Sequence, residues 1–253
     1  DKYLICGLGN PGDEYADTRH NTGFMVLDAF AKASNIHFED KRYGFVAETT
    51  LKGRKIILLK PTTFMNLSGN AVRYWLNQEK IDQSRLLVIS DELALPLGAF
   101  RLKANGSNGG HNGLGHIQQL IGQDYARLRM GIGNDYPRGG QIDWVLGKYS
   151  EEDMKQLQPA IDLGVEIIKS FVLQGIDNTM NQSLSFLVPE RRQNLLTQTG
   201  EMCEITFLIG FPSQQMGTLR HIFQTLAVED LLERPQAFPI SILRQPVDKD
   251  LIV

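Results

Sequence analysis

Residues 3–12 read YLICGLGNPG, an apolar run followed at once by a glycine-rich stretch. Four consecutive apolar residues, Tyr3 to Cys6, are typical of a buried strand. Gly7 to Gly12 then match the spacing G-x-G-x-x-G, with which a dinucleotide-binding crossover begins. An apolar strand that ends in a polar, glycine-rich turn indicates an α/β protein. It leaves open whether the turn binds a nucleotide.

Apolar runs and helical segments alternate beyond this first strand. Strands are expected at residues 2–6, 45–51, 54–60, 85–90, 98–104 and 127–132. Four amphipathic helices are expected. One starts near Thr22, one follows Ser68 as a candidate N-cap, one spans 112–121, and one runs from Ser150 to Gly175. The alternation predicts an α/β layer fold with a mostly parallel or mixed sheet.

Composition narrows the class of protein. The chain has 253 residues, of which 42% are apolar and 22% charged, as in ordinary globular proteins. No apolar run is long enough for a membrane span, and no leader pattern opens the chain. The net charge of −3 excludes a uniformly basic nucleic-acid binder, although a local basic patch is compatible with it. Two cysteines, with Cys6 in a core strand, favour a reducing, cytoplasmic setting.

The dinucleotide interpretation requires a helix that starts at the third glycine and an acidic residue at the end of the next strand. Gly12 is instead followed by the polar stretch DEYADTRHNTG, and the first helix begins only near Thr22. Asp28 has the right distance from the glycines but falls within that helix. Asn10-Pro11-Gly12 therefore indicates a turn rather than a phosphate cradle.

Polar side chains cluster after the predicted strands, where ligands collect in open α/β sheets. His20 is a candidate general base, and Asp91, at a strand end, is placed to accept its ring N–H. Side-chain amides could stabilise an oxyanion; the candidates are Asn10, Asn66 and Asn112. Ser68 lacks the nucleophile-elbow pattern, so direct attack by water is the implied scheme. His111 and His116 lack a metal-ligand pattern, and no metal is expected.

Four stretches together resemble the bacterial-type peptidyl-tRNA hydrolases: GLGNPGDEYADTRHNTGF, PTTFMNLSGNAV, DELALPLG and GSNGGHNGL. RLRMGIG and VLGKYS follow in the family's order, and the resemblance covers about residues 3–182. It implies a single α/β domain with a twisted, mixed sheet flanked by helices. It also implies hydrolysis of the ester that joins a peptide to tRNA, without metal or cofactor, by a cytoplasmic, monomeric enzyme.

The resemblance also implies residue roles. His20 would accept the proton, Asp91 would stabilise its basic form, and Asn10 would discriminate blocked from free aminoacyl-tRNA. The peptidyl and 3′ end of the tRNA would contact Tyr15, Phe64, Met65, Asn66, His111 and Asn112. Lys103 and Arg129 would clamp a tRNA phosphate, and Arg101 and Arg127 are expected on the same face of the sheet.

Two features depart from the family pattern. Ala94 replaces an acidic residue that is common in the family. Residues 183–253 have no counterpart in the family pattern. They are expected to form a C-terminal extension of unknown role, beside a catalytic domain of residues 1–182. A non-catalytic RNA-binding module that uses the same cleft is the alternative function.

Overall fold

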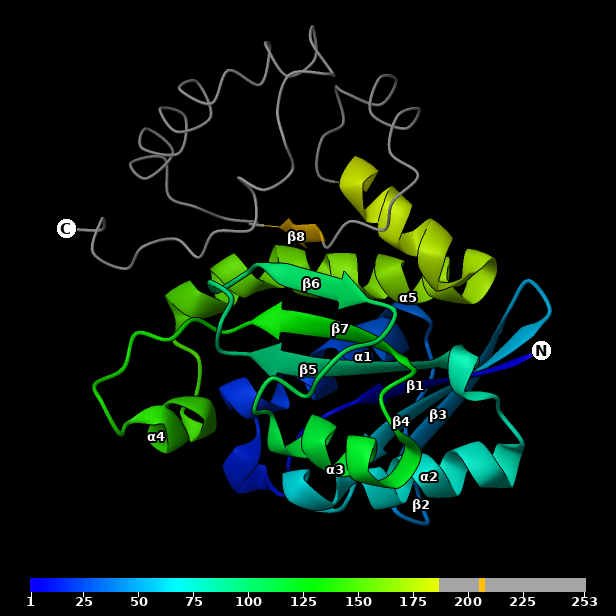
Figure 1. The fold of residues 1–253 in the computed structure, drawn as a ribbon, viewed down its shortest axis with the longest axis horizontal. Helices are drawn as coiled ribbons and strands as arrows, with labels where there is room; N and C mark the ends of the chain where they lie inside the picture. Colours follow the sequence, from blue (N-terminus) through cyan, green and yellow to red (C-terminus); the bar gives the residue numbers. More distant parts are fainter. Residues whose placement is uncertain (187–204, 208–253) are drawn as a thin grey trace, which may run out of the picture. The chain divides into compact units, whose positions relative to one another are not determined.

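The computed structural model describes residues 1–186 and 205–207, with side chains up to residue 182 (Figure 1). All of them lie within one compact unit, Asp1–Gly210. The helix predicted to stop at Gly175 is indeed broken there, because Gly175 has a non-helical conformation. A second helical stretch follows and runs to Phe186, past the expected domain boundary at 182. That boundary stays a prediction, and most of the C-terminal extension lies outside the described residues.

An eight-stranded sheet with the order β2-β3-β4-β1-β5-β7-β6-β8 forms the centre of this unit. Its strands are β1 (Lys2–Gly7), β2 (Glu39–Lys41), β3 (Gly44–Leu51), β4 (Arg54–Pro61), β5 (Leu86–Glu92), β6 (Phe100–Lys103), β7 (Ala126–Gly131) and β8 (Ile205–Phe207).

The sheet is mixed, as predicted, but its parallel pairs are confined to the centre. Strand β1 pairs in parallel with β4 and β5, and β5 pairs in parallel with β7. The four outer pairings are antiparallel, since β2, β3 and β4 form a meander and β6 runs against β7 and β8. The expectation of a mostly parallel sheet therefore holds only for its central strands, whose carboxyl ends meet at one edge.

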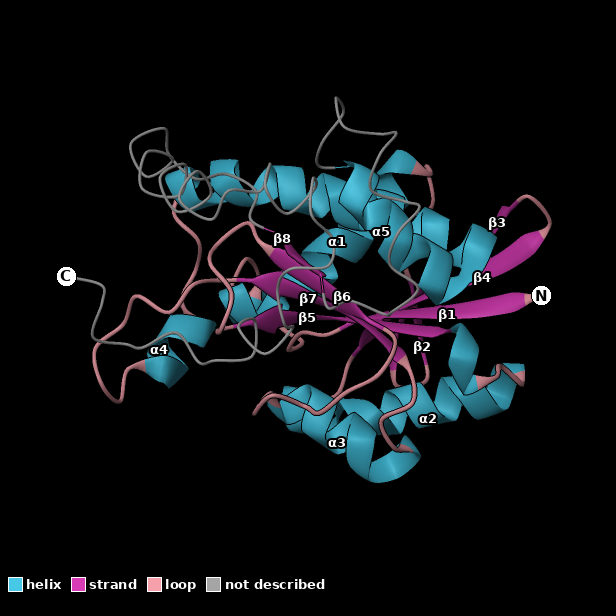
Figure 2. Cartoon of the chain, turned by 45° about the horizontal axis from the view of Figure 1, so that its top comes forward, coloured by secondary structure: helices cyan, strands magenta, loops and turns pink. Residues whose placement is uncertain are grey.

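Helices cover both faces of the sheet (Figure 2). One face carries α1 (Thr22–Ala33) and α5 (Glu151–Phe186), and the other carries α2 (Ser68–Glu79) and α3 (Asn112–Ile121). The short helix α4 (Gln141–Leu146) lies near the carboxyl edge. In α5, Gly175 interrupts the helix with a φ of 80°. No helix in residues 1–186 is long and apolar enough to cross a membrane.

Strand β1 supplies side chains to two separate apolar cores. Ile5 packs with residues of α1 and α5 in one core. Leu4 and Cys6 pack with residues of α2 and α3 in the other core. Successive side chains of a strand point to opposite faces, so the YLIC run fills both layers. Burial raises the pKa of the Cys6 thiol and keeps it protonated, as expected for a small core residue.

Two glycines bring the start of α1 into direct contact with the end of β1. A Cβ on Gly7 would lie 2.3 Å from the carbonyl oxygen of Gly23. A Cβ on Gly23 would lie 2.4 Å from the amide nitrogen of Leu8 and 2.5 Å from the carbonyl oxygen of Ile89. The first glycine of the GLGNPG stretch therefore serves helix packing, and it brings the residues before α1 over the ends of β1 and β5.

Replacing Gly23 with alanine is expected to lower the free energy of unfolding by about 1–3 kcal/mol, because the new methyl group meets backbone atoms that cannot rotate away. Urea unfolding measures the loss. Gly115→Ala is the matched control, since it also adds a methyl group within a helix but meets only Asn108 Nδ2 at 3.5 Å. That control should gain a few tenths to about 1 kcal/mol from helix propensity. Equal stabilities of the two variants would contradict the close approach.

Candidate active site

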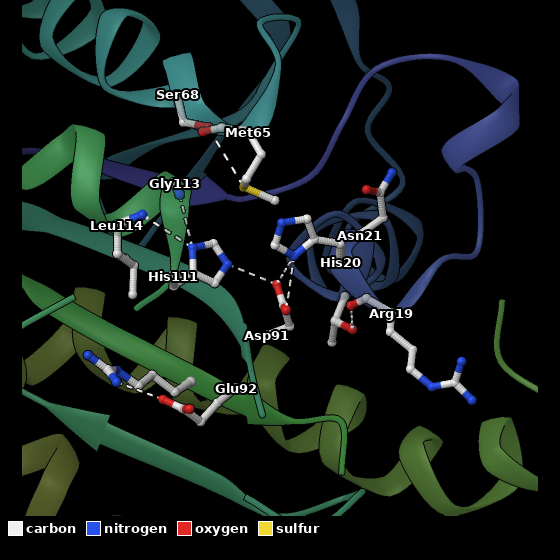
Figure 3. Close-up of polar contacts among 12 residues, drawn as sticks. Arg19, His20, Asn21, Met65, Ser68, Asp91, Glu92, His111, Gly113 and Leu114 are labelled. Carbon is white, nitrogen blue, oxygen red and sulfur yellow. Dashed lines mark hydrogen bonds and ion pairs between the residues drawn. The ribbon is translucent and has the colours of Figure 1, made fainter. Parts of the chain in front are cut away.

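Three polar side chains meet at the carboxyl edge of the central strands (Figure 3). His20 lies in a single 3-10 turn, Arg19–Asn21, immediately before α1. Asp91 is near the end of β5, and His111 is the residue that caps the N-terminus of α3. The three elements are far apart in sequence, and the parallel centre of the sheet brings them together.

Asp91 accepts hydrogen bonds from both histidines. His20 Nδ1 lies 2.9 Å from Asp91 Oδ1 and 3.0 Å from Oδ2, and His111 Nε2 lies 2.9 Å from Oδ1. The carboxylate is only 3% exposed, whereas the histidine side chains keep 12% and 9% of their surface, respectively. The carboxylate is thus buried, and both imidazoles that contact it are slightly more exposed.

The hydrogen bonds of His111 assign its tautomer. Its Nδ1 accepts from the backbone N–H groups of Gly113, at 3.1 Å, and Leu114, at 3.3 Å. The proton of the neutral ring is therefore on Nε2, which donates to Asp91. Asp91 can then accept a hydrogen bond from the N–H at Nδ1 of His20. This leaves the lone pair on His20 Nε2 available. That atom has the arrangement of a general base.

The environment of Asp91 keeps it ionised. Burial raises the pKa of its carboxyl, but the charges and hydrogen bonds of His111 and His20 outweigh burial and hold the pKa well below the ordinary 3.8. The carboxylate is therefore an acceptor at all physiological pH values and can stabilise a positive charge that forms on His20.

This lowered pKa links Asp91 to acid stability. A carboxyl whose pKa is lower in the folded chain stabilises it above the unfolded pKa of about 3.9, and this stabilisation is lost as the pH falls towards the folded value. We expect the free energy of unfolding of the wild type to drop more steeply below about pH 4 than that of Asp91→Asn. Urea titrations between about pH 2 and 6 measure both slopes. Parallel curves would show that Asp91 has an ordinary pKa.

Asn10 is fixed by backbone contacts on both sides. Its N–H donates to Asn21 Oδ1 at 2.8 Å, and Asn21 Nδ2 donates back to the Asn10 carbonyl at 2.9 Å. Asn10 Oδ1 accepts the N–H of Met65 at 2.8 Å. Its Nδ2 group makes no hydrogen bond with the described residues and is available to a ligand. The GLGNPG turn thus positions an amide donor, and Asn21 was not predicted although it directly follows His20.

The expected cleft residues lie in two hollows beside this centre. One hollow of about 360 Å³ is lined by Asn66, His111 and Asn112. A second, also of about 360 Å³, is lined by Asn10 and Phe24. Met65 is buried, whereas Phe64 is 57% exposed and offers its ring to a ligand. Tyr15 is half-buried and lines neither hollow.

The basic residues of β6 and β7 share one face, because Arg101 pairs with Arg129 and Lys103 with Arg127 across the antiparallel strands. Burial, together with the charges of Arg101, Arg129 and Arg127, lowers the pKa of Lys103. Glu92 offsets this effect only in part. The strands therefore produce a local positive field in a chain whose net charge is negative.

Only part of this basic face reaches solvent. Arg127 is fully buried, and its guanidinium donates to the carbonyls of Gly106, Ser107 and Gln123. Arg127 pairs with Lys103 across the two strands, as expected. Its side chain, however, is hydrogen-bonded to the loop at 106–107, which covers it. Arg129 is 7% exposed and pairs with Glu92 at 2.6 Å. Its role as a phosphate clamp stays a prediction.

The absence of a metal site stays a prediction. Of the histidine pair considered from the sequence, His116 Nδ1 accepts the N–H of Gly69 at 3.0 Å, whereas His111 binds Asp91. His20, Asp91 and His111 do place three ligand atoms within 4.8 Å of one another. In the assigned tautomers, however, the two ring N–H groups point at the carboxylate, so their lone pairs are not directed to a shared ion.

Sequence reasoning also missed the support behind His20. The Arg19 guanidinium lies 4.0 Å from the centre of the Trp144 ring and forms an ion pair with Asp153 at 3.1 Å. The hydroxyl groups of Thr22 and Tyr149 are 2.7 Å apart. These contacts hold the turn that carries His20 on both sides, through residues more than a hundred positions away.

The fold and site define an α/β enzyme with a histidine–aspartate pair at the carboxyl edge of its sheet. The family model described as "Peptidyl-tRNA hydrolase" matches residues 4–191. The chain is 62% identical to the peptidyl-tRNA hydrolase of Bacteroides fragilis over 182 residues, which covers 72% of this chain and 97% of that protein. The Phocaeicola vulgatus peptidyl-tRNA hydrolase has the same identity and coverage.

Solved structures agree with this match. The crystal structure of peptidyl-tRNA hydrolase from Acinetobacter baumannii superposes with a TM-score of 0.68 at 37% identity and covers 71% of this chain and 93% of that one. This chain therefore belongs to the peptidyl-tRNA hydrolase family and is a hydrolase. The family resemblance and the α/β fold expected from the sequence are both confirmed.

Proposed function

We propose that the enzyme hydrolyses the ester between a peptide, or an N-blocked amino acid, and tRNA, with His20 as the base that activates water. The observation that supports this proposal most directly is the Asp91 carboxylate, which binds His20 Nδ1 and leaves Nε2 free. Family membership supplies the substrate class. We further propose that the enzyme acts in the cytoplasm, as a monomer, where spent peptidyl-tRNA is returned to translation.

The proposed reaction needs no covalent enzyme intermediate. His20 Nε2 takes a proton from water, and the resulting hydroxide attacks the ester carbonyl. Asp91 stabilises the imidazolium, while amide donors such as Asn10 Nδ2 stabilise the oxyanion. The tetrahedral intermediate then collapses, and the proton on His20 passes to the 3′ oxygen of the ribose. The products are a peptide with a free carboxyl group and a tRNA with a free hydroxyl group.

The cleft residues have matching roles in this proposal. Asn10 would separate blocked from free aminoacyl-tRNA through its unpaired amide group. Tyr15 and Phe64 offer aromatic surface to the peptidyl and 3′ end, and Asn66 and Asn112 offer amides from the hollow beside His111. His111 lines that hollow and donates a hydrogen bond to Asp91, and Met65 would line the cleft beside it.

Turnover of an N-acetylated aminoacyl-tRNA, measured beside its unblocked form, tests this function. We expect release of free tRNA from the blocked substrate and much slower release from the unblocked one. Tight binding of both without turnover would instead favour the alternative, a non-catalytic RNA-binding module. Equal turnover of both would retain the esterase and remove the discriminating role of Asn10.

Lys103→Ala is expected to weaken tRNA binding most at low salt and to reduce the slope of log K against log salt by about 1, because one phosphate contact is lost. Filter binding at several salt concentrations measures that slope. Lys32→Ala is the control, since it removes an exposed lysine from α1, outside the β6–β7 face. An unchanged slope for Lys103→Ala would remove this residue from the phosphate contact.

A further inference from the structure

A third polar hollow lies away from the catalytic residues, between α2 and the turn that joins β2 to β3. It encloses about 380 Å³. Its lining consists of two arginines, two tyrosines and three side-chain amides: Arg42, Tyr43, Asn70, Arg73, Tyr74, Asn77 and Gln78. None of the site residues discussed above belongs to it, and we name it the α2 pocket.

Hydrogen bonds hold the residues that line the α2 pocket in place. Trp75 Nε1 donates to the Arg42 carbonyl at 3.0 Å, and the Tyr43 carbonyl accepts the N–H of Thr62 at 3.0 Å. The first bond fixes the β2–β3 turn on α2, and the second joins it to the end of β4. Tyr43 also has a φ of 65°, a left-handed conformation that is uncommon for a bulky residue. The turn therefore holds an aromatic ring at a position where glycine would be less strained.

Two aromatic rings, packed edge to face with an interplanar angle of 65°, and a guanidinium group lie together at this pocket. The Tyr43 and Tyr74 ring centroids are 5.3 Å apart, and the Arg42 guanidinium lies 5.3 Å from each ring centre. Tyr43 nevertheless remains 37% exposed, and Arg42 is exposed as well. Aromatic and guanidinium planes of this kind stack unpaired nucleic-acid bases, and the neighbouring amides can both donate to and accept from base edges.

The pocket also carries uncompensated positive charge. Neither Arg42 nor Arg73 forms an ion pair with any residue that the structure describes, and no acidic residue lines the pocket. The carboxylate of Glu79, at the end of α2, is already paired with Lys2 at 2.9 Å. Guanidinium groups without carboxylate partners suit phosphates, with which arginine forms bidentate hydrogen bonds.

We propose that the α2 pocket is a binding site for single-stranded RNA, in which one unpaired base stacks on the exposed Tyr43 ring beside Tyr74 and the flanking phosphates contact Arg42 and Arg73. The site needs no acyl group on the RNA and no contact with His20, so it is independent of the proposed hydrolysis. It lies on α2, whose first turn directly follows the cleft residues 64–67. An RNA strand that leaves the cleft along α2 would therefore reach it.

Fluorescence anisotropy with a fluorescein-labelled, single-stranded RNA of about eight nucleotides tests the site, since this length matches small stacking platforms. Tyr43→Gly removes the ring and suits the left-handed backbone, and Arg73→Gln removes an exposed charge, so both variants should fold. We expect each to weaken binding about tenfold, and Arg73→Gln to reduce the salt slope by about 1. Lys32→Gln on α1, on the opposite face of the sheet, is the matched charge control and should bind as the wild type does.

Two further measurements locate the binding and separate it from hydrolysis. Photo-crosslinking of the same RNA carrying 4-thiouridine should modify Tyr43 or Tyr74, and an RNA duplex of equal length should bind at least about tenfold more weakly because its bases cannot stack. Wild-type affinity in both pocket variants, or crosslinks confined to the cleft, would overturn the proposal. Turnover of an N-acetylaminoacyl adenosine should be unchanged in both variants, so loss of the His20 mechanism and loss of the α2 pocket are distinguishable.

Discussion

His20→Ala should lower kcat for an N-blocked aminoacyl-tRNA by about 10²- to 10⁴-fold, the usual contribution of a positioned general base. The substitution removes the imidazole that Asp91 orients, while the His111 hydrogen bond to the same carboxylate remains. The overall fold should survive, because His20 belongs to a short turn and to neither apolar core. Single-turnover kinetics, with circular dichroism as the measure of folding, gives both results.

His37→Ala is the matched control for this experiment. His37 is an exposed histidine in the loop between α1 and β2, so its removal should leave kcat unchanged. Retention of most activity in His20→Ala would refute His20 as the base. A similar loss in both variants would instead indicate a general effect on the preparation.

Asp91→Asn should also lower kcat strongly, by about 10²- to 10⁴-fold, and with little change in substrate affinity. The amide keeps the shape of the carboxylate but removes the negative charge that stabilises His20 as it gains a proton. It also replaces one acceptor atom with a donor, so His20 Nδ1 and His111 Nε2 must compete for a single oxygen. A substitution that leaves the geometry nearly intact but favours the wrong tautomer is costly in such histidine–carboxylate pairs.

Glu92→Gln provides the neighbouring control, since it makes the same carboxylate-to-amide change one residue further along β5. Its carboxylate pairs with Arg129 and does not contact His20. We expect kcat on a short acyl-adenosine substrate to change by less than about tenfold, a barrier change of less than about 1.4 kcal/mol, because this carboxylate does not contact the histidine–aspartate pair. Equal effects at the two positions would show that the strand end responds as a whole and that Asp91 has no special relation to His20.

The elements of the fold were largely predictable because strong local patterns specify them. Apolar runs located the six longer strands to within two residues, and helix α3 matches its predicted range, 112–121. The three-residue strand β2 was not recognised, since a strand of that length forms through pairing with a neighbour. Strand β8 lies within residues 203–211, CEITFLIGF, which the sequence predicts as a strand. Ser68 was expected to cap α2, but it is the first helical residue, and its Oγ donates to the Met65 carbonyl.

The sequence predicted that the candidate residues converge and that Asp91 accepts the ring N–H of His20, but it did not predict most of the other contacts. His20, Asp91 and Asn10 could be named from their places after strands, and the structure places all three at one edge. The hydrogen bond from Met65 to Asn10 joins residues 55 positions apart, which no local pattern reveals. The alternating R-L-R motif correctly placed Arg127 and Arg129 on one face. It could not show that the loop at 106–107 covers Arg127.

The imidazole of His111 has two structural roles. It caps the N-terminus of α3, and it donates a hydrogen bond to the Asp91 carboxylate. Serine, threonine, aspartate and asparagine usually occupy such caps, and none of them reaches Asp91 through a ring N–H while also accepting from the helix. The residue at position 111 must therefore both cap α3 and donate to Asp91, whereas the residue at position 20 has only the contact with Asp91. A substitution at His20 would therefore remove the proposed activity and leave the fold intact. A substitution at His111 would weaken both the start of α3 and the proposed activity.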